Sequence, residues 1–268
     1  MVIKHFCPTW GLESLSIEDA AKKIKAAGFD GMEIAVGANK AADATKTARA
    51  QGLEVILMAF GGGNNYTLHK TQFQSDLQQI AAAKPLFINA HTGRDYFTFD
   101  QNAELIQVAA NVAAATGVPI VHEMHRGRFS YSAPATQYYL SKFADLRLTA
   151  DLSHWVNVSE SLLVDQPQNV ARALDRTDHI HSRVGQPEAP QVTDPRAPEW
   201  KNCLDAHLVW WDTVVEKHRQ KGSAMLTITA EFGPAPGYLP TLPYTNQPVA
   251  SQWDINLFMK DLLKKRYG

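Results

Sequence analysis

Residues 118–123 read VPIVHE, a short run of mostly apolar residues that ends in an acid. Comparable runs follow as RLTADL at 147–152, DHIHSRV at 178–184 and MLTITAE at 225–231. Such runs are typical of strands that are covered on both faces, as in parallel sheets. Each run is followed by a longer amphipathic stretch, so this half of the chain predicts consecutive strand–helix units.

The N-terminal half repeats the same alternation. Its strands are expected at 2–6, 31–36, 54–59 and 86–91. Helices are expected at about 16–27, 38–51, 70–83, 100–116, 135–144, 159–174, 199–220 and 252–266. Eight units without a break in composition predict an α/β fold, a (β/α)₈ TIM barrel in one domain over 1–268. An open doubly wound sheet is the alternative, but the turn Cys7–Gly11 after the first strand is not the Gly-rich turn typical of it.

Composition narrows the choice of partners and compartment. The 268 residues carry a formal net charge of -1, which gives no overall field toward nucleic acid or anionic membranes. There is no apolar run near the roughly 18 residues of a membrane helix, and the N-terminus is expected to be a strand instead of a signal peptide. Cys7 and Cys203 form no metal or redox motif. These features predict a cytoplasmic protein without nucleic-acid or membrane partners, and they are compatible with a homo-oligomer.

Four successive late strands place an acid or an imidazole at the same rim of the predicted barrel, namely Glu123, Asp151, His181 and Glu231. Three converging carboxylates repel one another, and a divalent cation removes that repulsion. Oxygen and imidazole donors suit Mn²⁺, Mg²⁺, Co²⁺ or Zn²⁺. A single Glu at a strand end is more often a hydrogen-bond acceptor, and a single His in a strand is usually a core residue. The joint pattern nevertheless predicts one divalent metal ion held by all four.

Other polar and aromatic side chains near this rim are candidate substrate contacts: His154, Arg183, His91, Glu33, Arg126 and Trp10. An arginine there can hold a carboxylate, a phosphate or hydroxyl groups by forked hydrogen bonds. The structural alternatives are charge balance for the arginines and ordinary packing for the tryptophan. Two known motifs do not match. Arg126 replaces the second histidine of HExxH, and the segment Gly61–Asn65 lacks the Lys-Ser/Thr that follows a P-loop.

The set Glu123, Asp151-x-x-His154, His179-x-His181 and Glu231 resembles the xylose isomerase-like barrel superfamily, from the first strand to Glu231. That superfamily includes ketose 3-epimerases, hydroxypyruvate isomerase, inosose dehydratase and endonuclease IV. HEMHRGR at 122–128 and HSRVG at 181–185 are similar to proteins described as sugar phosphate isomerase/epimerase.

The resemblance implies a metal-dependent isomerase or epimerase that acts on a sugar, sugar phosphate or polyol in carbohydrate metabolism. In the ketose 3-epimerases the four ligands match those proposed above. Glu123 and Glu231 would then also be the acid/base pair that works through an enediolate, and His154 would bind substrate oxygens. The alternatives are a metal-dependent lyase of the inosose- or dehydroshikimate-dehydratase type and a non-catalytic sugar-binding barrel.

A DNA-repair role is disfavoured by departures from endonuclease IV. In that family an Asp-x-His pair follows the seventh strand, and here the stretch reads Asp194-Pro195-Arg196. A further family histidine, after the third strand, is replaced by Phe60. His91 does match a family histidine. The chain also lacks a basic face for DNA.

Overall fold

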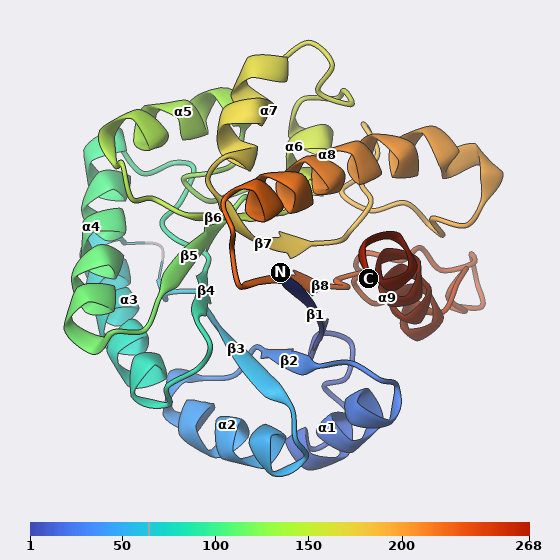
Figure 1. The fold of residues 1–268 in the computed structure, drawn as a ribbon, viewed down its shortest axis with the longest axis horizontal. Coiled ribbons are helices and arrows are strands. Elements are labelled where there is room, and N and C mark those ends of the chain that lie inside the picture. The colour runs from blue at the N-terminus through green and yellow to red at the C-terminus, as the bar shows by residue number, and fades with distance from the viewer. Residues whose placement is uncertain (64) are drawn as a thin grey trace.

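The computed structural model describes residues 1–63 and 65–268, and these form a closed barrel of eight parallel strands surrounded by helices (Figure 1). Neighbouring strands pair in chain order, and the last strand closes the barrel by pairing Phe6 with Thr229. The strands are β1 (Val2–Pro8), β2 (Gly31–Ile34), β3 (Glu54–Ala59), β4 (Ile88–Ala90), β5 (Ile120–Glu123), β6 (Leu148–Ala150), β7 (Thr177–His181) and β8 (Met225–Thr229). The predicted (β/α)₈ fold is confirmed.

The helices cover the outside of the barrel and bury their apolar faces against the sheet (Figure 1). They are α1 (Ile17–Ala26), η1 (Ala38–Lys40), α2 (Ala41–Ala50), α3 (Tyr66–Ala82), α4 (Phe99–Thr116), α5 (Ala133–Lys142), α6 (Leu152–Val158), α7 (Pro167–Leu174), η2 (Pro198–Trp200), α8 (Lys201–Gln220) and α9 (Gln252–Tyr267).

The prediction of one helix at 159–174 is wrong in part. Helix α6 begins directly after β6, and α7 begins only at Pro167. Glu160 and Leu163 between them have φ angles of 48° and 58°, and a left-handed backbone cannot continue a right-handed helix. Pro167 occupies the first turn of α7, where a missing backbone N–H removes no helical hydrogen bond.

Local capping chemistry explains other helix ends. The Ser16 side chain accepts a hydrogen bond from the Asp19 backbone N–H at the start of α1, and Gly28 follows this helix with a φ of 76°. Helix α3 begins before residue 70 because the Asn65 side chain accepts from the backbone N–H groups of Thr67 and Leu68. The segment Gly61–Asn65, which does not match a P-loop, includes Asn64, and this residue lies outside the described residues.

The barrel interior is filled in layers by side chains from alternate strands. An apolar floor, separate from the core between sheet and helices, consists of Phe6, Ile56, Phe87 and Val121. Above it the even-numbered strands supply a buried polar layer of Glu33, Asn89, Thr149 and Thr229. Side chains two residues apart on a strand point the same way. Ile56, Val121 and His179 point into the barrel, so the side chains two residues further along point inward nearer the mouth. These are Met58, Glu123 and His181, respectively.

Two further observations concern membrane-spanning helices and the cysteines. No helix within residues 1–63 and 65–268 is long and apolar enough to cross a membrane. Cys7 and Cys203 are free, buried thiols, and burial raises the pKa of the Cys7 thiol to about 12. A thiol of that pKa stays protonated and unreactive at neutral pH.

Candidate metal centre

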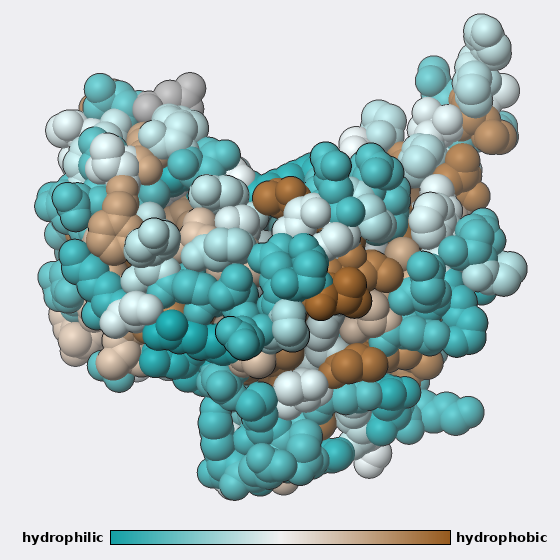
Figure 2. Space-filling model, turned by 90° about the horizontal axis from the view of Figure 1, so that it is seen from above, coloured by the Kyte–Doolittle hydropathy of each residue, from teal (hydrophilic) through white to brown (hydrophobic). Residues whose placement is uncertain are grey.

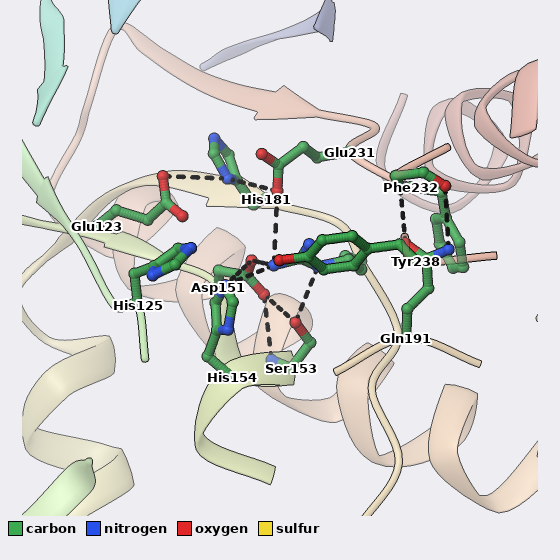
Figure 3. Close-up of polar contacts among 12 residues, drawn as sticks. Glu123, His125, Asp151, Ser153, His154, His181, Gln191, Glu231, Phe232 and Tyr238 are labelled. Carbon is green, nitrogen blue, oxygen red and sulfur yellow. Dashed lines mark hydrogen bonds and ion pairs between the residues drawn. The ribbon is translucent and has the colours of Figure 1, made fainter. Parts of the chain in front are cut away.

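Four acidic or imidazole side chains converge at the C-terminal mouth of the barrel. Glu123 and His181 are the last residues of β5 and β7, Asp151 follows β6 as the N-cap of α6, and Glu231 lies just beyond β8. One potential ligand atom from each lies within 4.8 Å of the others, and all four residues are buried (Figure 3). These are the four residues that the sequence singled out as metal ligands.

The two nitrogens of His181 have different surroundings. Nε2 lies 3.0 Å and 3.1 Å from the carboxylate oxygens of Glu33, whereas Nδ1 lies 3.0 Å from Glu231 and 3.6 Å from Glu123. Because a carboxylate accepts a hydrogen bond, Glu33 favours the tautomer with its proton on Nε2. In the neutral ring, which is the form that binds a metal, the Nδ1 lone pair is then directed at the carboxylates of Glu231 and Glu123.

Asp151 is held by residues that follow it in the chain. Ser153 donates to Asp151 Oδ1 from its backbone N–H at 3.2 Å and from its hydroxyl at 2.5 Å. The guanidinium of Arg183 pairs with Asp151 Oδ2, donates to the Ser153 hydroxyl at 3.0 Å and lies 3.9 Å from Glu231. The orientation of this carboxylate is therefore fixed before any ligand binds.

Burial and mutual repulsion shift the titration of the cluster. Burial raises the pKa of Asp151, and the carboxylates of Glu231 and Glu123 add to this, so that despite Arg183 the pKa is about 6. For Glu123, burial also opposes ionisation, but the imidazoles of His91 and His181 outweigh it and hold the pKa well below its usual range. Burial would lower the pKa of His181, but Glu231, Glu33 and Glu123 raise it well above the ordinary value.

The donor set fits a divalent cation. It offers three carboxylates and one imidazole, the mixture that Mn²⁺, Mg²⁺, Co²⁺ and Zn²⁺ accept. Two of its atoms, His181 Nδ1 and Glu231 Oε2, lie 3.0 Å apart as an ion pair, but neither has a hydrogen bond of normal geometry in the described part of the chain. Buried polar atoms without partners are rare in native proteins, and a coordinated ion would satisfy both atoms.

A second cluster shares Glu123 with the first. His91 Nε2 lies 2.8 Å from Glu123 Oε2, and the ring of His125 lies 4.5 Å from that of His91. His91, Glu123 and His125 also place one ligand atom each within 4.8 Å of the others. His125 was not among the predicted site residues. Its position two residues after Glu123 was the available signal.

A cavity of about 390 Å³ opens beside the four converging residues. Glu123 and Glu231 line it together with His91, His125 and Arg183, and the rest of its wall is mostly apolar. In Figure 2, which is turned by 90° from the view of Figure 1, the upper edge of the molecule is hollowed between two raised sides. Because Glu123 and Glu231 line this cavity, they are the two members of the proposed metal-ligand set that a bound molecule would touch.

The predicted substrate contacts fall into two groups. His91, Arg183 and Trp10 line the cavity. The other three contact protein groups and do not line it in the described structure: Glu33 lies in the polar layer, His154 is fully buried with Nε2 2.7 Å from Arg183 Nη2, and Arg126 donates to Asn157 at 3.1 Å.

Several cavity residues were missed from the sequence. Tyr238 comes from the long segment between β8 and α9, and its ring packs edge-on against Trp10 at 4.7 Å. Met58 is the second-last residue of β3, and Phe60 directly follows that strand. The length of the β8–α9 segment was a signal for a functional loop, but nothing in its sequence indicated which side chain faces inward.

Searches among known proteins complement this geometry. No protein-family model matches the chain, and no sequence match was found among curated proteins. Solved structures do match over almost the whole chain. A 3-keto-D-glucoside 4-epimerase from E. coli has a TM-score of 0.65 at 16% identity, with 98% of this chain and 100% of that chain covered. A D-psicose 3-epimerase has a TM-score of 0.64 at 12% identity, with 98% of each chain covered.

Proteins with other activities have the same fold. A probable 3-DHS dehydratase from Bacillus anthracis has a TM-score of 0.63 at 15% identity, with 98% of this chain and 99% of that chain covered. An endonuclease IV from Thermus thermophilus also matches, with a TM-score of 0.58 at 12% identity over 98% of this chain and 99% of that chain. The chain therefore shares its (β/α)₈ barrel fold with these epimerases, this dehydratase and this endonuclease, which agrees with the fold that the sequence resemblance predicted. At these identities the likeness establishes the fold alone, so function rests on the site.

Proposed function

We propose that this protein is a divalent-metal-dependent isomerase or epimerase of a sugar or polyol, with Glu123 and Glu231 as its proton-transfer pair. The observation that supports this most is that only two of the four converging residues line the cavity. Glu123 and Glu231 line the cavity, whereas Asp151 and His181 lie behind it. Two residues would hold the cation only, and two would hold it and also reach the substrate.

The chemistry requires a proton to leave and return at a carbon next to a carbonyl group. A bound divalent cation would supply electrostatic stabilisation for the negative charge that develops on the substrate oxygens. Glu123 and Glu231 lie on two sides of His181 in Figure 3, so one carboxylate can remove a proton and the other can deliver one. His91, which lies 2.8 Å from Glu123, would orient that carboxylate.

A lyase on the same scaffold is the second candidate. Expulsion of water needs a group that can protonate the departing hydroxyl, in addition to the base that removes the first proton. His125 lines the cavity close to Glu123 and offers such a third group. Formation of an unsaturated product, followed by ultraviolet absorbance, would distinguish this reaction from isomerisation.

Metal content tests the centre directly. We expect about one divalent ion per chain in the purified protein, measured by elemental analysis after reconstitution with Mn²⁺, Mg²⁺, Co²⁺ or Zn²⁺. His181→Ala removes a ligand, so that variant should lose the ion. His218→Ala is the matched control. His218 lies on α8, and its Nε2 lies 2.8 Å from the carbonyl oxygen of Thr177, at the end of β7 opposite to His181. Absence of metal from the wild-type protein in every reconstitution would refute the proposed centre.

Proton exchange tests the reaction. In deuterated water the metal-loaded protein should incorporate deuterium next to the carbonyl group of a ketose substrate, measured by nuclear magnetic resonance. Glu231→Gln should slow this exchange by at least about 100-fold, since a positioned acid or base typically contributes that much. The exposed Glu188→Gln serves as the control and should leave the rate unchanged. An unchanged rate in Glu231→Gln would remove Glu231 from the proton-transfer pair.

A further inference from the structure

The cavity has two chemically distinct ends. Around the proposed centre it is lined by Glu123, Glu231, His91, His125 and Arg183. Away from the centre, its wall comes from the segment between β1 and α1 and from the ends of β2 and β3. The apolar residues of that wall include Leu12, Leu15, Ile17, Val36 and Met58, whereas the ring of Phe60 lies 4.7 Å from that of His91 at the polar end. A molecule held by the polar end therefore extends into an apolar compartment.

The apolar end is unsuited to a phosphate group. In the described residues, the cavity is lined by no lysine and by a single arginine, Arg183, at the polar end. At the other end the only charged lining residue of the described chain is Glu13, whose carboxylate accepts from the Gly11 backbone N–H at 2.9 Å. An anion placed there would lose its hydration without gaining a cation, and Glu13 would repel it.

Arg183 is also unavailable to a phosphate, because its guanidinium is already occupied by protein groups. It pairs with Asp151, donates to Ser153 and is only 2% exposed. Its guanidinium carbon lies 5.8 Å from the ring centre of Trp10 and 5.2 Å from that of Tyr238, so two aromatic rings cover it. An incoming anion would have to displace Asp151 or these rings.

Trp10 forms a rigid part of the cavity wall. A side chain at position 233 would clash with it, since a Cβ atom on Gly233 would lie 2.4 Å from the Trp10 ring. Gln252 donates to the Trp10 carbonyl oxygen at 2.9 Å, and Tyr238 packs edge-on against the ring. An aromatic face fixed in this way can stack against an apolar ring or against the C–H face of a sugar.

We propose that the substrate is an uncharged sugar or polyol derivative that carries an apolar substituent, and that it is not a sugar phosphate. The substituent lies along Leu12, Leu15, Ile17 and Val36, while the hydroxyl-bearing part faces Glu123 and Glu231. The placement of the hydroxyl-bearing part of the substrate rests on the proposed function. The placement of the apolar substituent follows from the cavity wall itself.

Binding measurements on a ligand panel test the assignment. Phenyl glycosides of several common hexoses are compared by calorimetry with the methyl glycoside and the 6-phosphate of the same sugar. Burial of a phenyl ring should tighten binding about tenfold or more over the methyl glycoside for the best sugar. The 6-phosphates should bind more weakly than either. A 6-phosphate as the tightest ligand, no phenyl gain, or no binding by any member would each overturn the proposal.

A rim variant makes the test specific to this cavity. Leu15 is 38% exposed at the cavity edge, so Leu15→Lys adds a cation there without burying it in the core. We expect it to abolish the phenyl gain and to improve binding of the 6-phosphates. Leu68→Lys is the control, because Leu68 is 67% exposed on α3, away from the cavity, and should bind like the wild type. Thermal melting checks that both variants are folded, and equal ligand preferences in Leu15→Lys and the wild type would exclude the assigned compartment.

The proposed function and this inference can fail separately. The phenyl preference should persist in Glu231→Gln, where proton exchange is lost, because it depends on the apolar wall. Deuterium exchange into a sugar phosphate, without any phenyl preference, would retain the isomerase and overturn the substrate class. A Leu15-dependent phenyl preference without exchange into any sugar would support the compartment and contradict the isomerase.

Discussion

The Arg183 guanidinium is buried and faces both the carboxylates of the proposed centre and two aromatic rings. Burial would lower its pKa, but the carboxylates of Asp151 and Glu231 raise it further above its ordinary value. This residue is therefore a permanent cation that offsets part of the negative charge around it. Its role in the free protein is to hold Asp151, and any substrate contact is secondary to that.

Replacement of Arg183 should destabilise the metal-free protein more than the metal-loaded one. Arg183→Met leaves the Asp151 carboxylate buried without its partner, a loss typically on the order of 3–5 kcal/mol in the free energy of unfolding. A bound cation would compensate for part of that loss. Urea unfolding with chelator and with saturating metal measures both values, and equal losses in the two conditions would contradict the placement of Asp151 in the metal centre.

The control for this experiment is the exposed pair between Arg196 and Asp194. Pairs of this kind contribute only about 0–1 kcal/mol because water screens them. Arg196→Met should therefore leave the free energy of unfolding nearly unchanged in both conditions. It carries the same chemical change as Arg183→Met, so the comparison isolates the effect of burial and of the cluster.

At the scale of elements, the polar layer from the even-numbered strands supports the ligands above it. Glu33 on β2 accepts from Asn89 at 2.8 Å and from Thr229 at 2.5 Å, and it lies within hydrogen-bond distance of His181. Burial opposes ionisation of Glu33, but the imidazoles of His181 and His179 outweigh it and hold its pKa well below the usual range. The barrel thus places a fixed anion directly beneath the imidazole of the proposed centre.

Loss of that anion should weaken metal binding without removing any ligand. Glu33→Gln keeps the shape of the side chain but no longer favours the His181 tautomer that presents Nδ1, so metal affinity should fall about 10- to 100-fold. Competition with a chelator measures the affinity. Glu54→Gln changes the same residue type at the start of β3, far from the mouth, and should leave the affinity unchanged. Equal affinities in both variants would make Glu33 a purely structural residue.

The sequence predicted the elements better than their ends. All eight strands were found because their apolar runs are covered on both faces, a pattern that is local in sequence. The helix expected at 159–174 failed because left-handed residues such as Glu160 leave no signature in an apolar pattern. The end of β6 was also placed too late, because Asp151 caps helix α6 instead of ending the strand.

The candidate site was predictable for side chains at the ends of the late strands, and less so for side chains whose contacts depend on how other elements pack around them. Glu123 and His181 are fixed by the barrel, since parallel strands bring their carboxyl ends to one rim. His154 and Glu33 were expected to face the mouth, but the structure buries both against other protein groups. Tyr238 could not be predicted, because its position depends on how the β8–α9 segment folds over the barrel.

At the scale of the whole molecule, acid sensitivity is built into buried imidazoles around the barrel. Burial lowers the pKa of His5 on β1, of His122 on β5 and of His207 on α8 to about 4 in each case. All three are thus neutral in the fold at pH values where an exposed histidine begins to gain a proton. Each proton gained on unfolding in acid pulls the equilibrium toward the unfolded chain.

His207 offers the clearest test because both of its nitrogens are engaged. Nδ1 donates to the Cys203 carbonyl oxygen at 2.8 Å, and Nε2 accepts from the Gly185 backbone N–H at 3.2 Å. Burial, aided by Arg183, lowers the pKa from 6.5 to about 4, although the bond to Cys203 opposes the shift. Since the folded pKa is the lower one, the stabilisation is complete above about pH 6.5 and is lost as the pH falls toward 4.

The loss attributable to this one group should be on the order of 3 kcal/mol across that range. Urea unfolding of the chelator-treated protein at pH 7.5 and pH 4.5 measures the total loss, which includes His5 and His122. In His207→Gln, the amide replaces both hydrogen bonds but does not titrate, so the variant should lose less stability between the two pH values than the wild type. An identical loss in both proteins would mean that His207 is already protonated in the fold, and that its bond from the Gly185 N–H does not form.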